Sequence, residues 1–256
     1  MKEFDELVKI VKELRNPESG CPWDKKQTHS SLVPNFIEEL YESVEAIEDN
    51  DMTDLKEELG DLLLHIVMQA RIAEEDGHFV INEVLQSIND KLIRRHPHIF
   101  GEESIETANQ VKLNWEQIKL EEKEHRKSAL EGVPHSMPKL IVAQRMQEKA
   151  AAVGFDWENN DQVFEKLNEE IGELKEAILS GDQNSVVEEI GDLIFTTVNL
   201  SRKLGVDAET ALSSTNRKFE RRFQQVEEIY RKNRKKMHDS KLEQLDEVWK
   251  TVKDTE

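Results

Sequence analysis

Apolar residues recur along most of the chain at the three- and four-residue spacing of amphipathic α-helices. One helix is expected from Phe4 to Leu14, ending at Asn16-Pro17, and another is expected to start at Pro34. A further helix should end near Gly205. The remaining helices are expected at about residues 53–76, 80–95, 105–127, 138–152, 161–180, 207–235 and 241–253. The alternation typical of strands does not stand out, so we predict an all-α fold.

The composition supports the same fold class. Charged residues make up 35% of the 256-residue chain and aromatic residues 6%, with only ten glycines and six prolines. Many charged residues and few helix-breaking ones are typical of helix-rich proteins. The length is sufficient for one large domain or two small ones with a core.

Two acidic units with identical spacing divide the chain into similar halves. Each has the pattern E-E-x-x-E, followed after fifteen intervening residues by E-x-x-D. Residues three apart share a helix face, so each segment presents two carboxylates together. If its two helices pack antiparallel, each unit brings four carboxylates to one point. The units contain Glu38, Glu39, Glu42, Glu58 and Asp61 in the first half, and Glu169, Glu170, Glu173, Glu189 and Asp192 in the second.

Such a cluster of carboxylates requires cations, because two like charges about 4 Å apart repel by roughly 4 kcal/mol at an effective dielectric constant near 20. Hard oxygen ligands suit Mg²⁺, with Mn²⁺ as a substitute. Acidic helix faces are usually only solvated in a chain so rich in glutamate. A solvated face, however, gives no reason for the same acids to recur at the same spacing, whereas a metal site does.

Basic residues and tryptophans follow the acids in the same order in both halves. Each half has a Lys-x3-Arg pair and then a Trp-x3-Lys pair, and residues four apart lie on one face of a helix. Surface ion pairing would explain the basic residues taken alone. Together with metal-binding carboxylates, they are residue types that bind a nucleotide polyphosphate, with Trp offering a stacking surface. The pairs are Lys91 with Arg95 and Trp115 with Lys119 in the first half, and Lys218 with Arg222 and Trp249 with Lys253 in the second.

Residues 132–138, Gly-Val-Pro-His-Ser-Met-Pro, separate the two halves and have the composition of an interdomain linker. We therefore expect an N-terminal helical domain at residues 1–131 and a homologous C-terminal helical domain at residues 139–256. The sequence has no glycine-rich Walker motif or dinucleotide-binding motif, so a glycine loop is not expected to hold phosphates.

The net charge of −19 argues against binding to nucleic acid or to anionic membranes, since both need a basic surface. The single cysteine, Cys21, excludes an intramolecular disulfide and fits a reducing compartment. The N-terminus lacks the apolar region of a secretory signal, and the longest apolar stretch, Leu62 to Met68, is too short to cross a membrane. We expect a cytoplasmic protein with no membrane or nucleic-acid partner.

Two other classes of function are consistent with the residues alone. A helical regulatory or scaffold protein would leave the acids solvated and would bind no Mg²⁺ saturably. A carboxylate-bridged di-iron protein would bind iron and absorb visible light. His65 lies one helical turn after Asp61, but neither acidic unit contains the E-x-x-H motif of ferritin-type centres, so we do not favour iron.

These motifs together closely resemble the MazG family of nucleoside triphosphate pyrophosphohydrolases in its two-domain form, over essentially the whole chain. The resemblance implies an all-α fold whose helical domains pair in a homodimer. It also implies Mg²⁺-dependent hydrolysis of ribo- and deoxynucleoside triphosphates to monophosphate and pyrophosphate, in control or house-cleaning of the nucleotide pool. Besides the acidic units, it rests on Gly20-Cys-Pro-Trp-Asp24, Asp90-Lys-Leu-Ile-Arg-Arg-His-Pro-His98, Lys218-Phe-Glu-Arg-Arg-Phe223 and the terminal segment Trp249 to Lys253.

The resemblance implies a role for each motif residue. Glu169 would orient or deprotonate the attacking water, with Glu38 as its first-half equivalent. Metal would be bound by Glu170, Glu173, Glu189 and Asp192, and in the first half by Glu39, Glu42, Glu58 and Asp61. The triphosphate and nucleoside would be held by Lys166, Lys218, Arg222, Trp249 and Lys253, and in the first half by Lys91, Arg95, Trp115 and Lys119.

The two halves differ at two positions close to the acids. Lys166 and Asn199 in the second half correspond to Asn35 and Met68 in the first. The second half therefore has more polar groups for a substrate, and we expect it to be the more active one. The apolar stretches after the acids, Leu62-Leu-Leu and Leu193-Ile-Phe195, are expected in the core and in a dimer interface.

Overall fold

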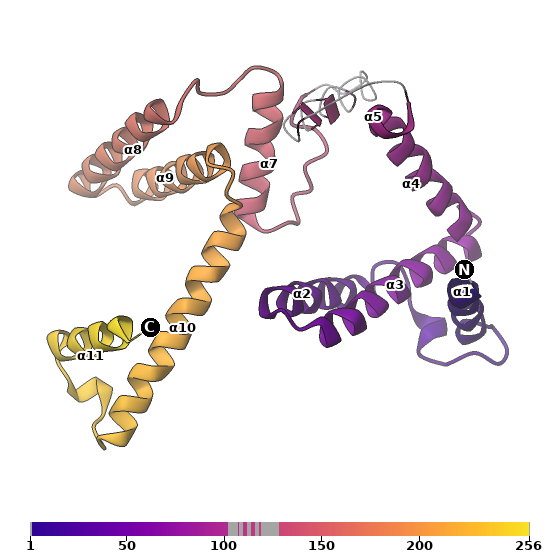
Figure 1. Cartoon of the computed structure of the whole chain (residues 1–256), viewed down its shortest axis with the longest axis horizontal. Helices are drawn as coiled ribbons and strands as arrows, with labels where there is room; N and C mark the ends of the chain where they lie inside the picture. Colours follow the sequence, from indigo (N-terminus) through magenta and orange to yellow (C-terminus); the bar gives the residue numbers. More distant parts are fainter. Residues whose placement is uncertain are drawn as a thin grey trace. The chain divides into compact units, whose positions relative to one another are not determined.

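The computed structural model describes residues 2–101 and 128–255, together with 107, 110, 111, 114, 115 and 118. Every regular element in those residues is helical, which confirms the predicted all-α fold (Figure 1). The chain divides into two compact units, Met1–Thr107 and Ala108–Glu256. The predicted linker at residues 132–138 stays a prediction. No described helix is long and apolar enough to span a membrane.

The first unit is built around α3 (Met52–Glu75), which packs against α1 (Lys2–Leu14) and pairs with α2 (Val33–Asp49). The short 3-10 helix η1 (Asp24–Lys26) precedes α2, and α4 (Ile81–Arg95) and α5 (Pro97–Phe100) follow α3. The core lies where α1 and the residue before α2 meet the second half of α3. Its buried residues are Val11, Leu32, Val67, Met68 and Ile72.

A tight turn joins α2 to α3 and determines how their acidic segments meet. Asn50 adopts φ of 56°, the left-handed conformation that Asn tolerates at the end of a helix. The Asp51 carboxylate accepts hydrogen bonds from the backbone amides of Thr53 at 2.9 Å and Asp54 at 3.1 Å, which caps α3. The two helices therefore form a hairpin, and the second acidic segment returns beside the first.

The second unit contains an equivalent hairpin of α8 (Asn160–Ser180) and α9 (Gln183–Lys203). Gly181 supplies the left-handed turn with φ of 74°, and Asp182 caps α9 by accepting from the Asn184 amide at 3.0 Å. α7 (Lys139–Ala152) packs against α9. The long α10 (Ala208–Lys232) and the short η2 (Met237–Asp239) lead to α11 (Leu242–Asp254), which packs on α10 through Val226, Tyr230 and Val252.

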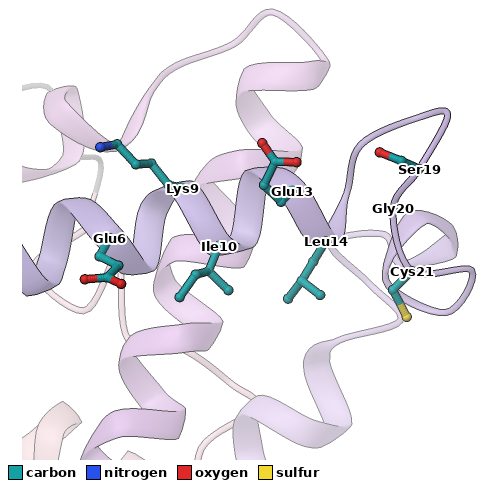
Figure 2. A pocket seen from close by; sticks show the side chains of 8 residues that line it. All are labelled: Glu6, Lys9, Ile10, Glu13, Leu14, Ser19, Gly20 and Cys21. Carbon is teal, nitrogen blue, oxygen red and sulfur yellow. The ribbon is translucent and has the colours of Figure 1, made fainter.

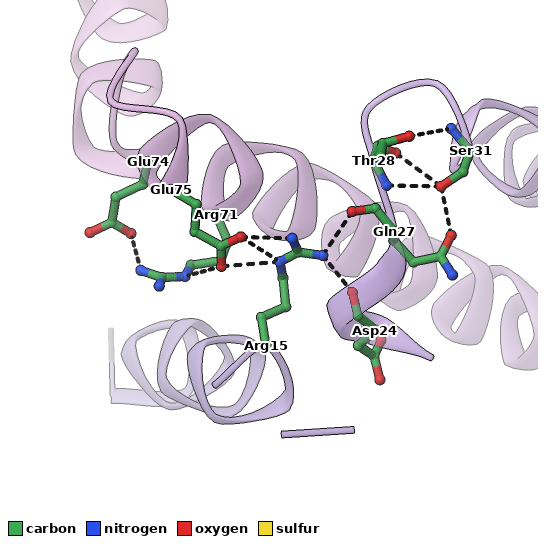
Figure 3. Close-up of polar contacts among 8 residues, drawn as sticks. All are labelled: Arg15, Asp24, Gln27, Thr28, Ser31, Arg71, Glu74 and Glu75. Carbon is green, nitrogen blue, oxygen red and sulfur yellow. Dashed lines mark hydrogen bonds and ion pairs between the residues drawn. The ribbon is translucent and has the colours of Figure 1, made fainter. Parts of the chain in front are cut away.

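Arg15 ties three segments of the first unit together (Figure 3). This residue is buried, and its guanidinium donates to the Glu75 carboxylate at 2.7 Å from Nη2 and 3.1 Å from Nε. Nη1 donates to the backbone carbonyls of Asp24 and Gln27. The hydrogen bond from Arg15, reinforced by Arg71, holds the pKa of Glu75 below its ordinary value. The loop before α2 is thereby fixed to the end of α3.

The Gly20-to-Asp24 motif has a structural role in this loop. A Cβ atom at Gly20 would lie 2.5 Å from the backbone oxygens of both Asn16 and Leu14, so only glycine fits. The amide of Cys21 donates to the Leu14 carbonyl at 2.8 Å. The motif therefore closes the turn that brings the chain from α1 towards α2.

The predicted helices agree with the structure wherever it describes them, whereas the predicted core needs a correction. The helix predicted at residues 161–180 is Asn160–Ser180, and the one predicted at 105–127 lies largely outside the described residues. Leu63, Ile194 and Phe195 were predicted in the core and in a dimer interface. They are 37%, 49% and 41% exposed in the single chain, so they lie outside its core, and the interface stays a prediction. The reason is that a hairpin of two helices covers only one face of each helix.

Candidate metal and nucleotide site

The first acidic cluster lies across the hairpin of α2 and α3. One carboxylate oxygen from each of Glu39, Glu58 and Asp61 lies within 4.8 Å of the others. Glu39 comes from α2 and the other two come from α3, and all three are half-buried. Glu42, the fourth predicted ligand, is exposed and close enough for its charge to raise the pKa of both Glu39 and Glu58.

The second cluster repeats this arrangement on α8 and α9. Carboxylate oxygens of Glu170, Glu173 and Glu189 lie within 4.8 Å of one another. Glu170 is buried, with only 3% of its surface exposed. Asp192, the fourth predicted ligand, is exposed, and its charge contributes to raising the pKa of Glu189.

The carboxylates of each cluster disfavour one another's charged forms. Partial burial, followed by the charges of Asp61 and Glu42, raises the pKa of Glu39. Burial and the neighbouring carboxylates act in the same order on Glu58 and Glu189. A divalent cation would offset this repulsion, and carboxylate oxygens are the donors that Mg²⁺ and Mn²⁺ prefer. The residues present therefore fit a hard divalent metal.

The equivalent residues Glu39 and Glu170 have different neighbours in the two halves. Lys166 Nζ lies 2.8 Å from Glu170 Oε1 and 2.7 Å from Glu169 Oε1. Its hydrogen bonds to Glu169 and then to Glu170 raise the pKa of Lys166. The predicted general base of the second half, Glu169, is therefore already paired with a lysine.

In the first half, His65 is the side chain that lies beside the Glu39 carboxylate. Its Nε2 atom lies 3.9 Å from Glu39 Oε1, its ring packs 5.7 Å from that of Phe36, and burial lowers its pKa. The position one turn after Asp61 was the sequence signal for this neighbour. Glu38, the predicted base of this half, is exposed on α2.

Of the residues predicted for substrate binding in the second half, Lys166 lies on α8 beside the acids, and the other four lie on α10 and α11. The rings of Phe219 and Trp249 are 5.2 Å apart, which places the segment that holds Lys218 and Arg222 beside α11. Lys253 follows one turn after Trp249 on the same helix. The structure thus forms two groups, the acids on one hairpin and this basic and aromatic group on another pair of helices. That the acids and the basic and aromatic residues form a single site stays a prediction.

Phe219 and Phe223 were not singled out as site residues from the sequence. Their rings stack 5.7 Å apart, and Phe219 is 56% exposed beside Trp249. In the first half, Lys91 is exposed and Arg95 half-buried on α4, while Trp115 is half-buried. The prediction for Lys119 falls outside the described residues.

The difference between Asn199 and Met68 has a structural basis. Asn199 Oδ1 accepts a hydrogen bond from Arg202 Nη2 at 3.0 Å, and the same nitrogen donates to Asp156. Met68 is instead buried in the core of the first unit. Arg202 was not predicted from the sequence, because its contact with Asp156 joins positions far apart in the chain.

A pocket in the first unit lies between α1 and the loop that follows it (Figure 2). Cys21 is at one end of this pocket, and none of the residues predicted for metal or substrate binding lines it. Its lining residues are Glu6, Lys9, Ile10, Glu13, Leu14, Ser19, Gly20 and Cys21.

Comparison with known proteins relates the geometry of both hairpins to one family. Residues 27–100 and 158–227, which include the two acidic clusters, match the MazG nucleotide pyrophosphohydrolase domain. The chain is 46% identical to the nucleoside triphosphate pyrophosphohydrolase of Escherichia coli K12 over 259 residues, 99% of this chain and 98% of that protein.

Two proteins from Thermotoga maritima are also similar. The nucleoside triphosphate pyrophosphohydrolase/pyrophosphatase MazG is 48% identical over 251 residues, 98% of this chain and 95% of that protein. The crystal structure of a MazG-related protein has 28% identity and a TM-score of 0.39, covering 46% of this chain and 98% of that chain. On the domain match and the full-length similarity, the chain belongs to the MazG family.

Proposed function

We propose that the protein is a nucleoside triphosphate pyrophosphohydrolase that uses Mg²⁺ at its acidic clusters and releases nucleoside monophosphate and pyrophosphate. The observation that carries this function is the presence of matching carboxylate clusters on both hairpins of a MazG-family chain. Its full-length relatives in Escherichia coli and Thermotoga maritima have the same activity in their names. Deoxynucleotides are included in the proposed substrate class.

The proposed metal ligands are the four acids of each hairpin. Glu170, Glu173 and Glu189 of the second half are already within 4.8 Å of one another, as are Glu39, Glu58 and Asp61 of the first. Asp192 and Glu42 complete the two sets. A bound divalent cation would supply the positive charge that hydrolysis of a polyphosphate requires.

The remaining residues have roles in binding and proton transfer. Glu169 lies next to Glu170 in the sequence, where its carboxylate can accept a proton from water attacking the α-phosphorus. Lys218, Arg222 and Lys253 carry the positive charges that pair with phosphate oxygens. Phe219 is exposed and Trp249 is half-buried beside it, and these two rings suit stacking of the nucleobase.

The protein is proposed to act as a homodimer whose hairpins pair between copies. On α2, Ile37, Leu40, Val44 and Ile47 alternate at three- and four-residue spacing and are 47%, 50%, 40% and 55% exposed. This is the pattern of a helix seam that packs against another helix pair. Two hairpins that join through such seams form a four-helix bundle with a closed core. A second copy also offers a way to bring a basic and aromatic group to an acidic cluster.

The dimer has a direct test by light scattering. The wild-type protein should have twice the monomer mass at micromolar concentration. Leu40 and Ile171 occupy equivalent positions on α2 and α8. The double variant Leu40→Asp/Ile171→Asp should shift the protein towards monomer, because dimerisation would then bury charged side chains in the seam. Ile10→Asp on α1, an exposed apolar position outside both hairpins, should leave the mass unchanged. A stable wild-type monomer would refute the dimer.

Metal removal tests the proposed function. The protein should release pyrophosphate from a panel of canonical and modified nucleoside triphosphates when Mg²⁺ is present. EDTA should abolish the release, because the carboxylates lose the metal ion whose positive charge binds the substrate. Adding excess Mg²⁺ should restore it. Hydrolysis that persists after chelation would contradict the dependence on metal. No pyrophosphate release together with no saturable Mg²⁺ binding by the folded protein would favour a scaffold function. Activity that requires iron would favour the di-iron alternative.

A further inference from the structure

The two halves differ at the position one helical turn before the equivalent carboxylates Glu39 and Glu170. In the second half, the Lys166 ammonium contacts Glu170 at 2.8 Å and Glu169 at 2.7 Å. The first half has the uncharged Asn35 at the position of Lys166. A positive charge therefore already lies on a proposed metal ligand in one half, whereas the first half has an uncharged residue there.

Burial explains why Glu170 holds this lysine. Glu170 is 3% exposed, and a buried carboxylate without a partner is strongly destabilising. The Lys166 side chain satisfies it while remaining 32% exposed itself, so the ammonium is held at the edge of the cluster. Its flexible four-carbon stem leaves it able to reorient towards another anion.

The lysine and a divalent cation compete for the same carboxylate. An ammonium within hydrogen-bonding distance of Glu170 repels a cation bound by that residue, and it occupies one of the oxygens that the cation needs. Metal binding to the second cluster therefore requires Lys166 to give up its contact with Glu170. A triphosphate would offer the displaced ammonium a new anionic partner.

We propose that the Lys166 ammonium occupies the second cluster in place of a metal ion until a triphosphate draws it away. Metal binding at the second cluster therefore depends on the triphosphate, whereas the first cluster binds metal without a triphosphate. This inference rests on the proposed function. The coupling is reciprocal, so a triphosphate that draws Lys166 away strengthens metal binding by the same factor as metal strengthens triphosphate binding. Lys166 thus acts as a positioning residue for the metal as well as a contact for phosphate.

Mn²⁺ binding without nucleotide tests this directly, with full-length protein and electron paramagnetic resonance of free Mn²⁺. The double variant Glu58→Gln/Asp61→Asn isolates the second cluster, and Glu189→Gln/Asp192→Asn isolates the first. The isolated second cluster should bind Mn²⁺ at least about tenfold more weakly than the first, because metal binding there requires the charge-assisted contact between Lys166 and Glu170 to break.

Substitution of the lysine should then remove the difference. Lys166→Asn, which copies the first half, and Lys166→Gln, which retains more of the side chain, should each strengthen Mn²⁺ binding at the isolated second cluster about tenfold. Asn35→Lys should weaken binding at the isolated first cluster. Lys175→Asn removes an equal charge from the exposed face of α8 and should change the affinity less than threefold. Circular dichroism confirms that each variant is folded.

The outcomes separate this inference from the proposed function. Equal Mn²⁺ affinity of the two isolated clusters, or no change on Lys166 substitution beyond that of Lys175→Asn, would overturn the inference and leave the metal-dependent function intact. Absence of Mn²⁺ binding at both clusters would contradict the inference and the metal-dependent function together.

Discussion

Glu189→Gln or Asp192→Asn should reduce the turnover of nucleoside triphosphates by at least about a hundredfold, equivalent to roughly 2.7 kcal/mol of lost transition-state stabilisation. Each change removes one negative charge from the second cluster while keeping the shape of the side chain. The metal that neutralises the polyphosphate is then bound less tightly or in a different position. Steady-state kinetics on several substrates measures the loss.

The matched first-half variants, Glu58→Gln and Asp61→Asn, should reduce turnover less. The reason is that the second half has Lys166 to meet a phosphate, whereas the equivalent position in the first half is Asn35. A lost charge-assisted phosphate contact corresponds to roughly ten- to a hundredfold in rate when it acts in the transition state. Equal or larger losses from the first-half variants on every substrate, with folding verified by circular dichroism, would reverse the ranking of the two sites.

Arg15→Met should lower the free energy of unfolding of the first unit by roughly 2 kcal/mol, because it removes the buried guanidinium and leaves the Glu75 carboxylate paired only with Arg71. It also removes the donor to the loop carbonyls of Asp24 and Gln27 (Figure 3). Urea unfolding measures the loss, and hydrogen exchange of the α3 amides locates it in the first unit.

A surface ion pair provides the control for Arg15. Arg231 pairs with Glu228 at 2.6 Å, but its side chain is 75% exposed, so Arg231→Met should cost less than about 0.5 kcal/mol. The pKa of Glu75 is lowered in the folded protein. The stability that this carboxylate gives the fold is therefore complete above the ordinary carboxyl pKa and is lost as the pH falls through the lowered pKa. The difference in the free energy of unfolding between the wild-type protein and Arg15→Met should therefore become smaller at acidic pH. A loss no larger than that of Arg231→Met at neutral pH would contradict the role of Arg15.

Much of the fold and of the acidic clusters follows from local sequence rules. The three-residue spacing of Glu39 with Glu42 and of Glu58 with Asp61 places each pair on one helix face. The turn at Asn50 and Asp51 is equally local, since both residues act on backbone groups within a few positions. Together these signals were sufficient to predict that the hairpin gathers carboxylates.

Other features depend on contacts that spacing alone does not specify. Lys166 lies one turn before Glu170, but the contact between the two residues follows from the burial of the Glu170 carboxylate. Arg202 contacts Asp156 across 46 positions, which no local pattern indicates. The exposure of Ile194 and Phe195 depends on which helices cover α9, and that is a tertiary property.

The bond that is cleaved is the most direct test of the proposed chemistry. Purified protein with Mg²⁺ and a nucleoside triphosphate in ¹⁸O-labelled water can be followed by ³¹P nuclear magnetic resonance. Attack on the α-phosphorus predicts nucleoside monophosphate and pyrophosphate as the only products, with the label in the monophosphate. Formation of nucleoside diphosphate and orthophosphate would contradict a pyrophosphohydrolase.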